Sequence, residues 1–554
     1  MKIPYKWQEK AIQEKTGKEF FMLNCACGLG KTFVFISIAK QYKEPKIIIA
    51  PKNITYQWKD ELLSEDLPEE KIWVHEQTEQ TKKKEKYLEE FVEWAKNGGE
   101  YLIIATQTFS LNVRAHKQKG VELLPQVVQL MLGLHGKNLF VILDESSWIK
   151  ANSPAKTQLS SRSQMIKLLG SLVKYKAAGT GTMMSKNPMN VYDQFEFLKP
   201  NFWAVNRNEF FLNHCITKTN YFYGKKNVTL ISKKEVEEIQ RVLRNPIRGL
   251  SQYTGVDDGE DLNKLIRIAQ KYNLKVDEVK ILTDMQGYFP FKNLDKIYKQ
   301  IEPFTVTVRR EDVFDISFDK FIYEPIQLPV KMTAEQKKLY KSLVDNTFGS
   351  DVYIDKVKAS ELRYRLQDIC LGFLPEKDTV SGEIKFLPLK ENPKLEMLIE
   401  KIKEIGEEEQ IVVWVARKNA VQSIADRLTE EEIPFVIYTG DQNAKEKQEA
   451  ERKMESKEAR VFIGNINAGS FGLNALKDCN YLFWYCLNDS PERIHQAAHR
   501  ILRGQSKNPK FGYFIYVENS FELSQFLANQ QGEEFIKFRN EKGVFFNENR
   551  RRGN

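Results

Sequence analysis

The chain has 554 residues, of which 42% are hydrophobic and 12% aromatic, and its formal net charge is +9. This length exceeds one ordinary core and suits two or three domains, while the apolar content excludes general disorder. The charge is mildly basic for a chain with 29% charged residues, so it permits a polyanionic partner without requiring one.

The cysteines and the N-terminus indicate where the protein works. The 6 cysteines are scattered, and Cys25 and Cys27 form a CxC with no second pair at a zinc-ligand spacing. We interpret them as reduced, mostly buried residues of an intracellular protein. The N-terminal run MKIPYKWQEK lacks the apolar core of a signal peptide, and no run approaches the roughly 18 apolar residues of a membrane span. We therefore expect a soluble, cytoplasmic protein with no membrane partner (in a virus, the cytoplasm of the host).

Short apolar runs recur between helix-like segments, and such runs are typical of strands buried on both faces of a parallel sheet. The first series comprises Lys46–Ala50, Tyr101–Ala105 and Leu139–Leu143, and the second comprises Ile411–Val415, Pro434–Tyr438, Val461–Gly464, Tyr481–Tyr485 and Tyr513–Val517. Between the strands, Asn419–Leu428 has the apolar spacing of one helix face. The pattern predicts an α/β fold with two lobes, each a parallel sheet with flanking helices.

Between the two series the strand pattern is lost. Residues 206–325 contain lysine-rich amphipathic stretches and an acidic segment, Asp257–Asp261, which we expect to be a loop. We predict a largely helical insertion and connector here. The two lobes would then occupy residues 1–205 and 326–554, and the second lobe would end in a short basic tail.

A glycine-rich turn near the N-terminus has the composition of a phosphate-binding loop. In the run CGLGKT, Gly28 and Gly30 let backbone N–H groups approach an anion, Lys31 neutralises phosphate charge and the Thr32 hydroxyl can bind Mg²⁺. Cys25 stands where the usual loop has its first glycine. A simple turn with a surface lysine is therefore the alternative interpretation of this run alone.

Two acidic residues, Asp144 and Glu145, directly follow the apolar run LFVIL. Reactive groups of open α/β sheets collect at the carboxyl ends of the strands, so we expect this pair on the same edge as the phosphate loop. Asp144 would hold Mg²⁺ through its water shell, and Glu145 would polarise the attacking water. The alternative for an isolated Asp-Glu pair is a solvated turn.

Two further motifs lie near the C-terminus. Gly472 belongs to the run AGSFGLN, where the backbone can approach phosphate, and Arg500 and Arg503 lie three residues apart in QAAHRILRGQ. On one helical face these two arginines could reach a transferring phosphoryl group. With Lys31 at the other end of the chain, this arrangement predicts two lobes that close on ATP.

In order and in residues, these motifs resemble the core of superfamily 2 helicases, in particular its Swi/Snf-type branch. The matching runs, which extend from about residue 3 to 517, are Trp7-Gln8, Gly28–Thr32, Ala50–Lys52 with Trp58 and Glu61, Thr106–Thr108, Asp144–Lys150, Gly181–Pro188, AGSFGLN and QAAHRILRGQ. The resemblance implies two tandem RecA-like lobes, ATP and Mg²⁺ as cofactors, adenine reading by Gln8, and coupling of hydrolysis to movement through Gly181 and Thr182. Within the branch, the chain looks most like the compact helicases of bacteriophages and large DNA viruses.

The sequence departs from the family pattern at two positions. Ser147 stands where the family usually has histidine, and Met183 replaces the proline that follows Gly181-Thr182. These changes retain the residues for metal binding and water activation. They bear instead on how hydrolysis is coupled to the nucleic-acid track.

The resemblance also implies residues that bind nucleic acid, mainly at phosphates, because a motor must ignore sequence. The candidates are Lys52, Thr106 and Gln107 in the first lobe and Arg417, Thr439 and Asn467 in the second. For each of them the alternative is a strand-end residue that caps a loop. We expect a monomeric, ATP-dependent DNA translocase or helicase acting on duplex or branched DNA. The alternatives are an RNA-directed or transcription-associated ATPase and a two-lobed clamp that does not hydrolyse ATP.

Overall fold

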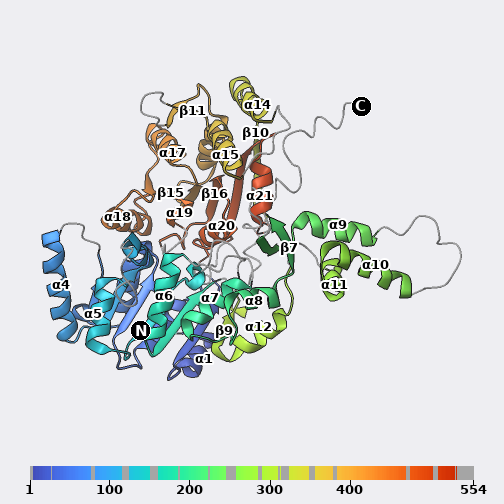
Figure 1. Ribbon diagram of the computed structural model, residues 1–554. Coiled ribbons are helices and arrows are strands. Elements are labelled where there is room, and N and C mark those ends of the chain that lie inside the picture. Colours follow the sequence, from blue (N-terminus) through green and yellow to red (C-terminus); the bar gives the residue numbers. More distant parts are fainter. Residues whose placement is uncertain are drawn as a thin grey trace. The chain divides into compact units, whose positions relative to one another are not determined.

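The computed structural model forms two compact units, the first comprising residues 1–26 and 30–310 and the second comprising residues 311–554 together with residues 27–29 (Figure 1). It describes residues 4–26, 28–76, 81–114, 124–149, 160–181, 183–184, 188–222, 225–244, 258–284, 290–309, 312–313, 324–348, 356–377, 384–469, 475–502, 509–530 and 532. Among these residues, every helix is too short or too polar to cross a membrane.

The first unit is built on a seven-stranded sheet with the order β3-β4-β2-β5-β6-β1-β9, in which all pairings are parallel. Its strands are β1 (Phe20–Cys25), β2 (Lys46–Ala50), β3 (Ile72–Val74), β4 (Tyr101–Ala105), β5 (Phe140–Leu143), β6 (Tyr175–Thr180) and β9 (Thr305–Val308). Every residue of β2, β4 and β5 is buried. Burial on both faces explains why these strands appear as continuous apolar runs in the sequence.

Helices flank the first sheet and fill its core. They are α1 (Lys6–Lys15), α2 (Lys31–Ala39), α3 (Thr55–Ser64), α4 (Thr81–Lys96), α5 (Gln126–His135), α6 (Ser161–Leu172), α7 (Met189–Leu198), α8 (Arg207–His214) and α12 (Leu294–Ile301). Buried side chains of α8 and α12, such as Phe210 and Ile297, belong to the same core as Phe91 of α4 and Phe195 of α7. Segments at both ends of the predicted insertion, residues 206–325, are therefore built into the core of the first lobe.

The predicted insertion is largely helical and has a core of its own. It contains the antiparallel hairpin β7 (Thr217–Phe222) and β8 (Lys225–Leu230), followed by α9 (Lys233–Arg244), α10 (Asp258–Tyr272) and α11 (Val276–Asp284). Ile216, Val236, Ile268 and Val279 are among the residues that pack together there. The expectation of an acidic loop is wrong for residues 258–261, because they form the first turn of α10; Asp257 lies outside the described residues.

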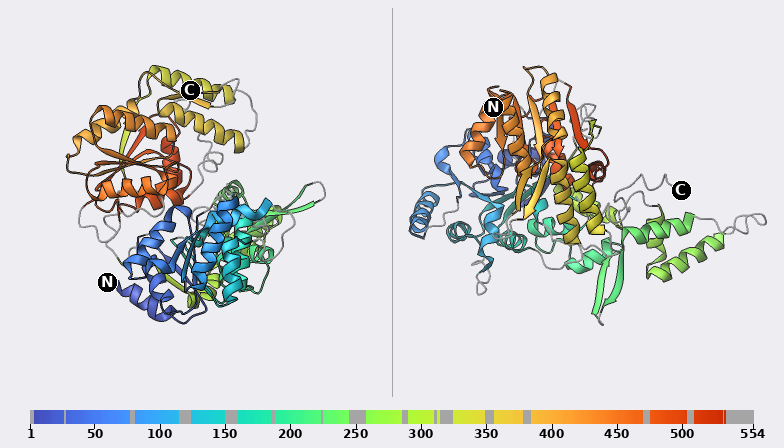
Figure 2. Two further views of the ribbon diagram at one scale, coloured as in Figure 1. Left: turned by 90° about the vertical axis from the view of Figure 1, so that its left-hand side faces the viewer. Right: turned by 90° about the horizontal axis from the view of Figure 1, so that it is seen from above.

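The second unit contains a six-stranded, all-parallel sheet with the order β10-β17-β16-β13-β15-β14. Its strands are β10 (Ile326–Val330), β13 (Ile411–Val415), β14 (Phe435–Tyr438), β15 (Val461–Asn465), β16 (Tyr481–Cys486) and β17 (Phe511–Val517). Figure 2, left, shows these strands between layers of helices. Alternate side chains of β13 enter two separate cores, Trp414 on one face and Val413 on the other. The prediction of two α/β lobes of the RecA-like type is confirmed.

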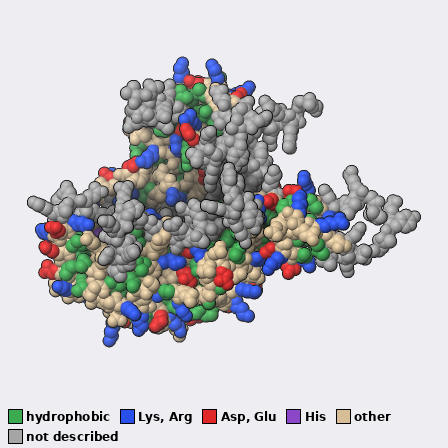
Figure 3. Space-filling model, in the orientation of Figure 1, with side chains coloured by type: hydrophobic (Ala, Val, Ile, Leu, Met, Phe, Trp, Pro, Cys, Tyr) green, Lys and Arg blue, Asp and Glu red, His purple; other side chains and the backbone are tan. Residues whose placement is uncertain are grey.

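The helices of the second unit are α14 (Ala334–Phe348), α15 (Lys356–Cys370), α16 (Pro393–Glu404), α17 (Lys418–Glu430), α18 (Ala444–Glu455), α19 (Ile466–Gly469), α20 (Pro491–Ala498) and α21 (Glu522–Gln530). A small antiparallel hairpin, β11 (Phe373–Lys377) with β12 (Ile384–Pro388), precedes α16. Basic and acidic side chains are interspersed on the surface of both units in the view of Figure 3, which fits the modest net charge.

Candidate functional site

The turn between β1 and α2 has the backbone geometry of a phosphate-binding loop. Gly28 and Gly30 have φ values of +80° and +81°, a conformation that side chains disfavour. Gly30 immediately precedes the first residue of α2, Lys31, whose Nζ donates a hydrogen bond of 3.0 Å to the carbonyl of Cys25. The lysine thus spans the turn. A helix N-terminus behind such a turn favours anions, because its N–H groups and dipole point toward them.

Gln8 of α1 is buried and holds the helix against this turn. Its Oε1 accepts a hydrogen bond of 2.8 Å from the N–H of Tyr5, and its Nε2 donates one of 3.3 Å to the carbonyl of Gly30. A Cβ atom placed on Gly30 would lie 2.6 Å from Gln8 Nε2. The residue that the family resemblance assigns to adenine therefore also supports the glycine turn.

Cys25, which replaces the usual first glycine, is a buried and unreactive thiol. Burial raises its pKa to about 12, so the sulfur stays protonated at neutral pH. Its Sγ donates a weak hydrogen bond of 3.8 Å to the carbonyl of Val306 in the neighbouring strand β9. The cysteine therefore serves as a packed strand residue at the start of the loop.

Asp144 and Glu145 lie at the carboxyl end of β5, two strands from β1 in the sheet. Because all these strands are parallel, the acidic pair and the glycine turn share one edge of the first sheet. The Asp144 carboxylate accepts hydrogen bonds of 2.9 Å from Trp58 Nε1 at Oδ2 and from the Glu145 N–H at Oδ1. Asp144 is only 6% exposed and Glu145 only 9%, which excludes the alternative of a solvated turn.

A buried amide connects the residue after Glu145 with the segment after β6. Ser146 Oγ donates a hydrogen bond of 2.6 Å to Gln194 Oε1, and Gln194 Nε2 donates to the carbonyls of Met183 at 2.9 Å and Asn190 at 2.8 Å. The Met183 N–H in turn donates to Asn24 Oδ1 at 3.3 Å. Neither Gln194 nor Asn24 was predicted from the sequence to take part in a site. A polar amide inside the apolar helix MNVYDQFEFL was the available signal for the first of them.

The three nucleic-acid candidates of the first unit meet at the ends of two paired strands, β2 and β4. Gln107 Oε1 accepts hydrogen bonds from the Lys52 N–H at 3.2 Å and from Thr106 Oγ1 at 3.0 Å. The Lys52 side chain is exposed, whereas Thr106 is fully buried. Lys52 is thus the member of the group whose charge faces solvent, and Thr106 supports the loop through Gln107.

The candidates of the second unit engage other residues of that unit. Arg417 forms a two-pronged ion pair with the buried carboxylate of Asp368, with contacts of 2.6 to 2.9 Å. The Thr439 N–H donates to Gln442 Oε1 at 2.8 Å. Asn467 Oδ1 accepts a hydrogen bond of 3.1 Å from Asn488 and another from the Arg493 guanidinium. These contacts hold the segments that follow β13, β14 and β15.

The helix predicted to carry Arg500 ends before it. Helix α20 begins after Ser490, whose side chain caps it, and ends at Ala498, so Arg500 lies in the following turn. Arg500 is only 7% exposed, and its charge acts on Tyr438, whose pKa burial raises above its usual range and Arg500 partly lowers. Three predicted site residues lie outside the described residues: Thr182, Gly472 and Arg503.

The donor atoms of the first unit suit a Mg²⁺ ion that arrives with its substrate. Among the described residues, His, Cys, Asp and Glu side chains form no group of three or more that could hold a resident metal. Mg²⁺ is commonly held by one or two carboxylates, several waters and substrate phosphates, and not by a full protein cage. The buried carboxylate of Asp144 and the hydroxyl of Thr32, on the first turn of α2, fit this pattern.

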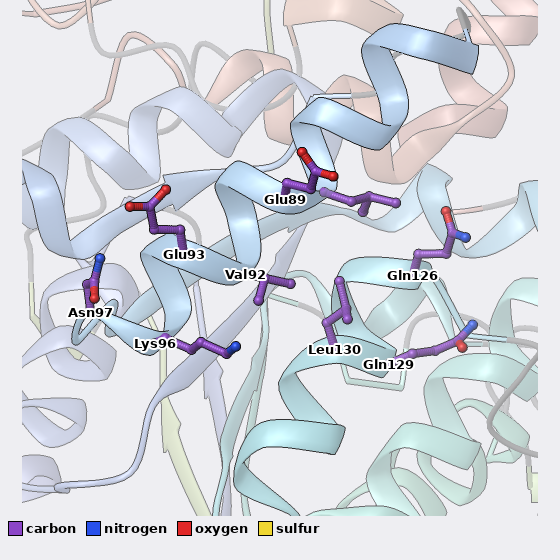
Figure 4. Close-up of a pocket in the computed structure, with 9 residues that line it drawn as sticks. Glu89, Val92, Glu93, Lys96, Asn97, Gln126, Gln129 and Leu130 are labelled. Atoms are coloured by element: carbon purple, nitrogen blue, oxygen red, sulfur yellow. The ribbon is translucent and has the colours of Figure 1, made fainter.

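A cavity of about 820 Å³ lies between α4 and α5 of the first unit. Figure 4 shows Val92 and Leu130 pointing into it from the two helices, with Glu89, Glu93 and Gln126 around it. None of the residues predicted to bind ATP or nucleic acid lines this cavity. It is therefore a feature separate from the candidate site.

Two family models match the sequence, one in each unit. Residues 2–166 match the type III restriction enzyme, res subunit, and residues 393–505 match the helicase conserved C-terminal domain. The chain is similar to the solved Sulfolobus solfataricus SWI2/SNF2 ATPase core in complex with dsDNA, with 16% identity over 98% of this chain and 94% of that one and a TM-score of 0.33. A second structure, the Sulfolobus solfataricus SWI2/SNF2 ATPase core domain, has 16% identity over 94% and 86% of the two chains and a TM-score of 0.30. No protein of curated function matches the sequence significantly.

Proposed function

Both units of the chain carry the superfamily 2 helicase core, and from this premise we propose an ATP-dependent DNA translocase or helicase of the Swi/Snf type. Hydrolysis of ATP would drive its movement along duplex or branched DNA. The observation that carries the proposal is the common sheet edge of the glycine turn with Lys31 and the buried pair Asp144-Glu145. This edge supplies phosphate binding, a metal ligand and a carboxylate for water in one lobe.

Each residue has a chemical role in this proposal. The backbone of Gly28 and Gly30 and the ammonium of Lys31 would bind the phosphates, and Thr32 and Asp144 would hold Mg²⁺. Glu145 orients and polarises the attacking water. When bound, Mg²⁺ neutralises charge on the β- and γ-phosphates. Arg500 and Arg503 of the second unit stabilise the charge of the transition state.

The nucleic-acid track is proposed from the strand ends of both sheets. Lys52 presents an exposed charge at the end of β2, beside Gln107, where a phosphate can bind without sequence recognition. In the second unit, Arg417, Thr439 and Asn467 remain the proposed contacts. Gly181, the residue after β6, and Thr182 would transmit the state of the nucleotide to this track. We propose duplex DNA and not RNA as the track, because the motifs resemble those of the Swi/Snf-type branch.

The deciding experiment compares ATP hydrolysis on duplex DNA, forks, four-way junctions, single strands and RNA at one salt concentration. We expect the largest stimulation from duplex or branched DNA. Stimulation by RNA alone would replace the proposal with an RNA-directed ATPase. ATP binding without turnover on any nucleic acid would favour the non-hydrolysing clamp.

A further inference from the structure

Glu145 has an unusual backbone conformation for a residue with a side chain. Its φ and ψ are +51° and +50°, in the left-handed region. A residue other than glycine keeps this conformation only where the surrounding contacts hold it there. The backbone conformation determines the direction in which the Glu145 side chain leaves the chain. Since Glu145 is the proposed water-polarising group, the contacts that hold this backbone also bear on the position of its carboxylate.

Both neighbours of Glu145 in the chain are anchored. On the N-terminal side, Asp144 is bonded to Trp58 at 2.9 Å and to the Glu145 N–H at 2.9 Å. On the C-terminal side, the Ser146 hydroxyl donates to Gln194 at 2.6 Å, and both of these side chains are 0% exposed. The left-handed turn is therefore clamped at both of its ends inside the protein.

Gln194 cannot easily turn away from this contact. Both hydrogens of its amide nitrogen are used, one by the carbonyl of Met183 and one by that of Asn190, so its oxygen is directed at Ser146. Helix α7 thus presents a fixed acceptor to the turn that carries Glu145. An apolar side chain of similar size could fill the space but could not accept the hydroxyl hydrogen.

The same amide also connects to the strand that begins the phosphate loop. The Met183 N–H donates to Asn24 on β1, next to Cys25. Proline, the residue expected here from the family pattern, has no N–H and could not make this bond. The departure at Met183 therefore adds a hydrogen bond to a network of Ser146, Gln194, Met183 and Asn24.

We propose that Gln194 is a positioning residue for ATP hydrolysis, which acts through Ser146 to hold Glu145 in its productive orientation. The inference rests on the proposed function, because it requires Glu145 to act on water. Gln194 should therefore affect turnover and leave the binding of ATP unchanged. Its amide bonds to Ser146 and to the carbonyls of Met183 and Asn190, and none of these residues belongs to the glycine turn.

The test compares Q194L, S146A and their double variant in DNA-stimulated ATP hydrolysis. Each single variant should lower kcat about 10- to 100-fold and leave the KM for ATP within about twofold, because misplacement of a reacting group costs rate and not ground-state binding. The double variant should be no slower than the slower single variant, because the two side chains act as one unit. An unchanged kcat in Q194L, or a rise in KM that accounts for the loss, would overturn the inference.

The matched control is Q410L in the second unit. Gln410 is also a buried glutamine whose amide bridges two carbonyls, those of Met454 and Ala459 at 2.7 and 2.9 Å. Q410L should lower thermal stability as Q194L does, yet keep kcat within about twofold. If Q410L loses turnover to the same degree, the effect of Q194L is one of general stability and the inference fails.

A measurement without ATP separates this inference from the proposed function. Hydrogen exchange at the amides of residues 145–148 should be at least about tenfold faster in Q194L than in the wild type, and unchanged in Q410L. A wild type that never hydrolyses ATP would refute the proposed function. Faster exchange in Q194L would still show that Gln194 holds the turn that carries Glu145. An exchange rate in Q194L equal to that of the wild type would refute this role of Gln194, whatever the activity of the wild type.

Discussion

Trp58 donates its indole N–H to Asp144 Oδ2 over 2.9 Å, and both side chains are buried. The indole belongs to α3, which follows the loop of Lys52, and the carboxylate ends β5. A hydrogen bond from a buried donor fixes the direction of the carboxylate. Asp144, the proposed metal ligand, is thus oriented by α3, the helix that follows Lys52 of the proposed nucleic-acid track.

Removal of the Trp58 N–H should lower kcat and raise the Mg²⁺ concentration that ATP hydrolysis requires. W58F keeps most of the aromatic packing but loses the N–H, so we expect a fall in kcat of about tenfold and a higher Mg²⁺ requirement. A Mg²⁺ titration of ATP hydrolysis measures both. W94F is the control, because Trp94 in the same unit donates to the backbone of Glu70 at 2.8 Å and touches no proposed ligand. An equal effect of the two variants would contradict the role of Trp58.

Substitutions of the proposed nucleotide-site residues should differ in whether they reduce ATP binding or only ATP turnover. K31A and E145Q should each lower hydrolysis by about 100-fold or more, and R500A should retain ATP binding while turnover is lost. K10A, which removes an exposed lysine of the same unit, should change neither. Fluorescent-nucleotide binding and a phosphate-release assay, run side by side, check the pattern. Substantial hydrolysis by K31A or E145Q would remove that residue from the site.

Arg417 should contribute more to stability than an exposed arginine can. R417A leaves the carboxylate of Asp368, which is 2% exposed, without its cation, so we expect a loss of about 3 to 5 kcal/mol in the free energy of unfolding of the second unit. K418A breaks the adjacent but exposed pair with Asp441 and should cost less than about 1 kcal/mol.

Urea denaturation of these two variants, and of R417A/D368N, tests the assignment. The added D368N change should recover part of the loss, because a neutral amide is cheaper to bury alone than a carboxylate. If R417A unfolds like the wild type but binds DNA weakly, Arg417 acts as a track contact and the ion pair is unimportant for stability.

Gly30 and Gly17 offer a matched pair of glycines with the same φ of +81°. A Cβ on Gly30 would lie 2.6 Å from Gln8, whereas nothing lies within 4 Å of a Cβ on Gly17. G17A should cost about 1 to 2 kcal/mol from backbone strain alone. G30A should also displace Gln8 and raise the KM for ATP by about tenfold or more, which thermal unfolding and steady-state kinetics can separate. Equal KM values in the two variants would contradict the role of the contact.

The first unit should lose stability in mild acid through His75. Burial lowers the pKa of this imidazole to about 4, whereas in the unfolded chain it titrates near its usual 6.5. The unfolded state therefore binds more protons between these values, so this contribution is fully present above about pH 6.5 and is lost as the pH falls towards 4. Urea unfolding should show a change of about 3 kcal/mol in the free energy of unfolding across this pH range in the wild type, and little change in H75Q. Parallel pH profiles of the two proteins would refute the assignment.

Several strands could be predicted from the sequence because all of their residues are buried. KIIIA and YLIIA became β2 and β4 with the predicted bounds, and IVVWV became β13. The edge strands β9 and β10 were not predicted. Their sequences, TVTV and IQLPV, keep several residues in contact with solvent, and β10 contains a proline that a central strand would exclude. One-sided burial therefore left no continuous apolar signal.

The site was predictable where the backbone itself demands a residue type. Gly28 and Gly30 have the positive φ that their spacing before Lys31 indicates. Contacts between distant side chains were not predictable, because Ser146 and Gln194 are 48 residues apart and Arg417 and Asp368 are 49 apart. Only the folded chain brings these pairs together, and each decides how a nearby site residue is held.

Strand β9 has a consequence for how the protein can be divided and made. It pairs with β1 from Met22 to Cys25, on the side opposite β6. A fragment that stops at residue 205 would leave β1 as an open edge, free to recruit strands from other molecules and aggregate. During synthesis, more than 300 residues must leave the ribosome before β9 can complete this sheet, so β1 lacks one of its two partner strands until then.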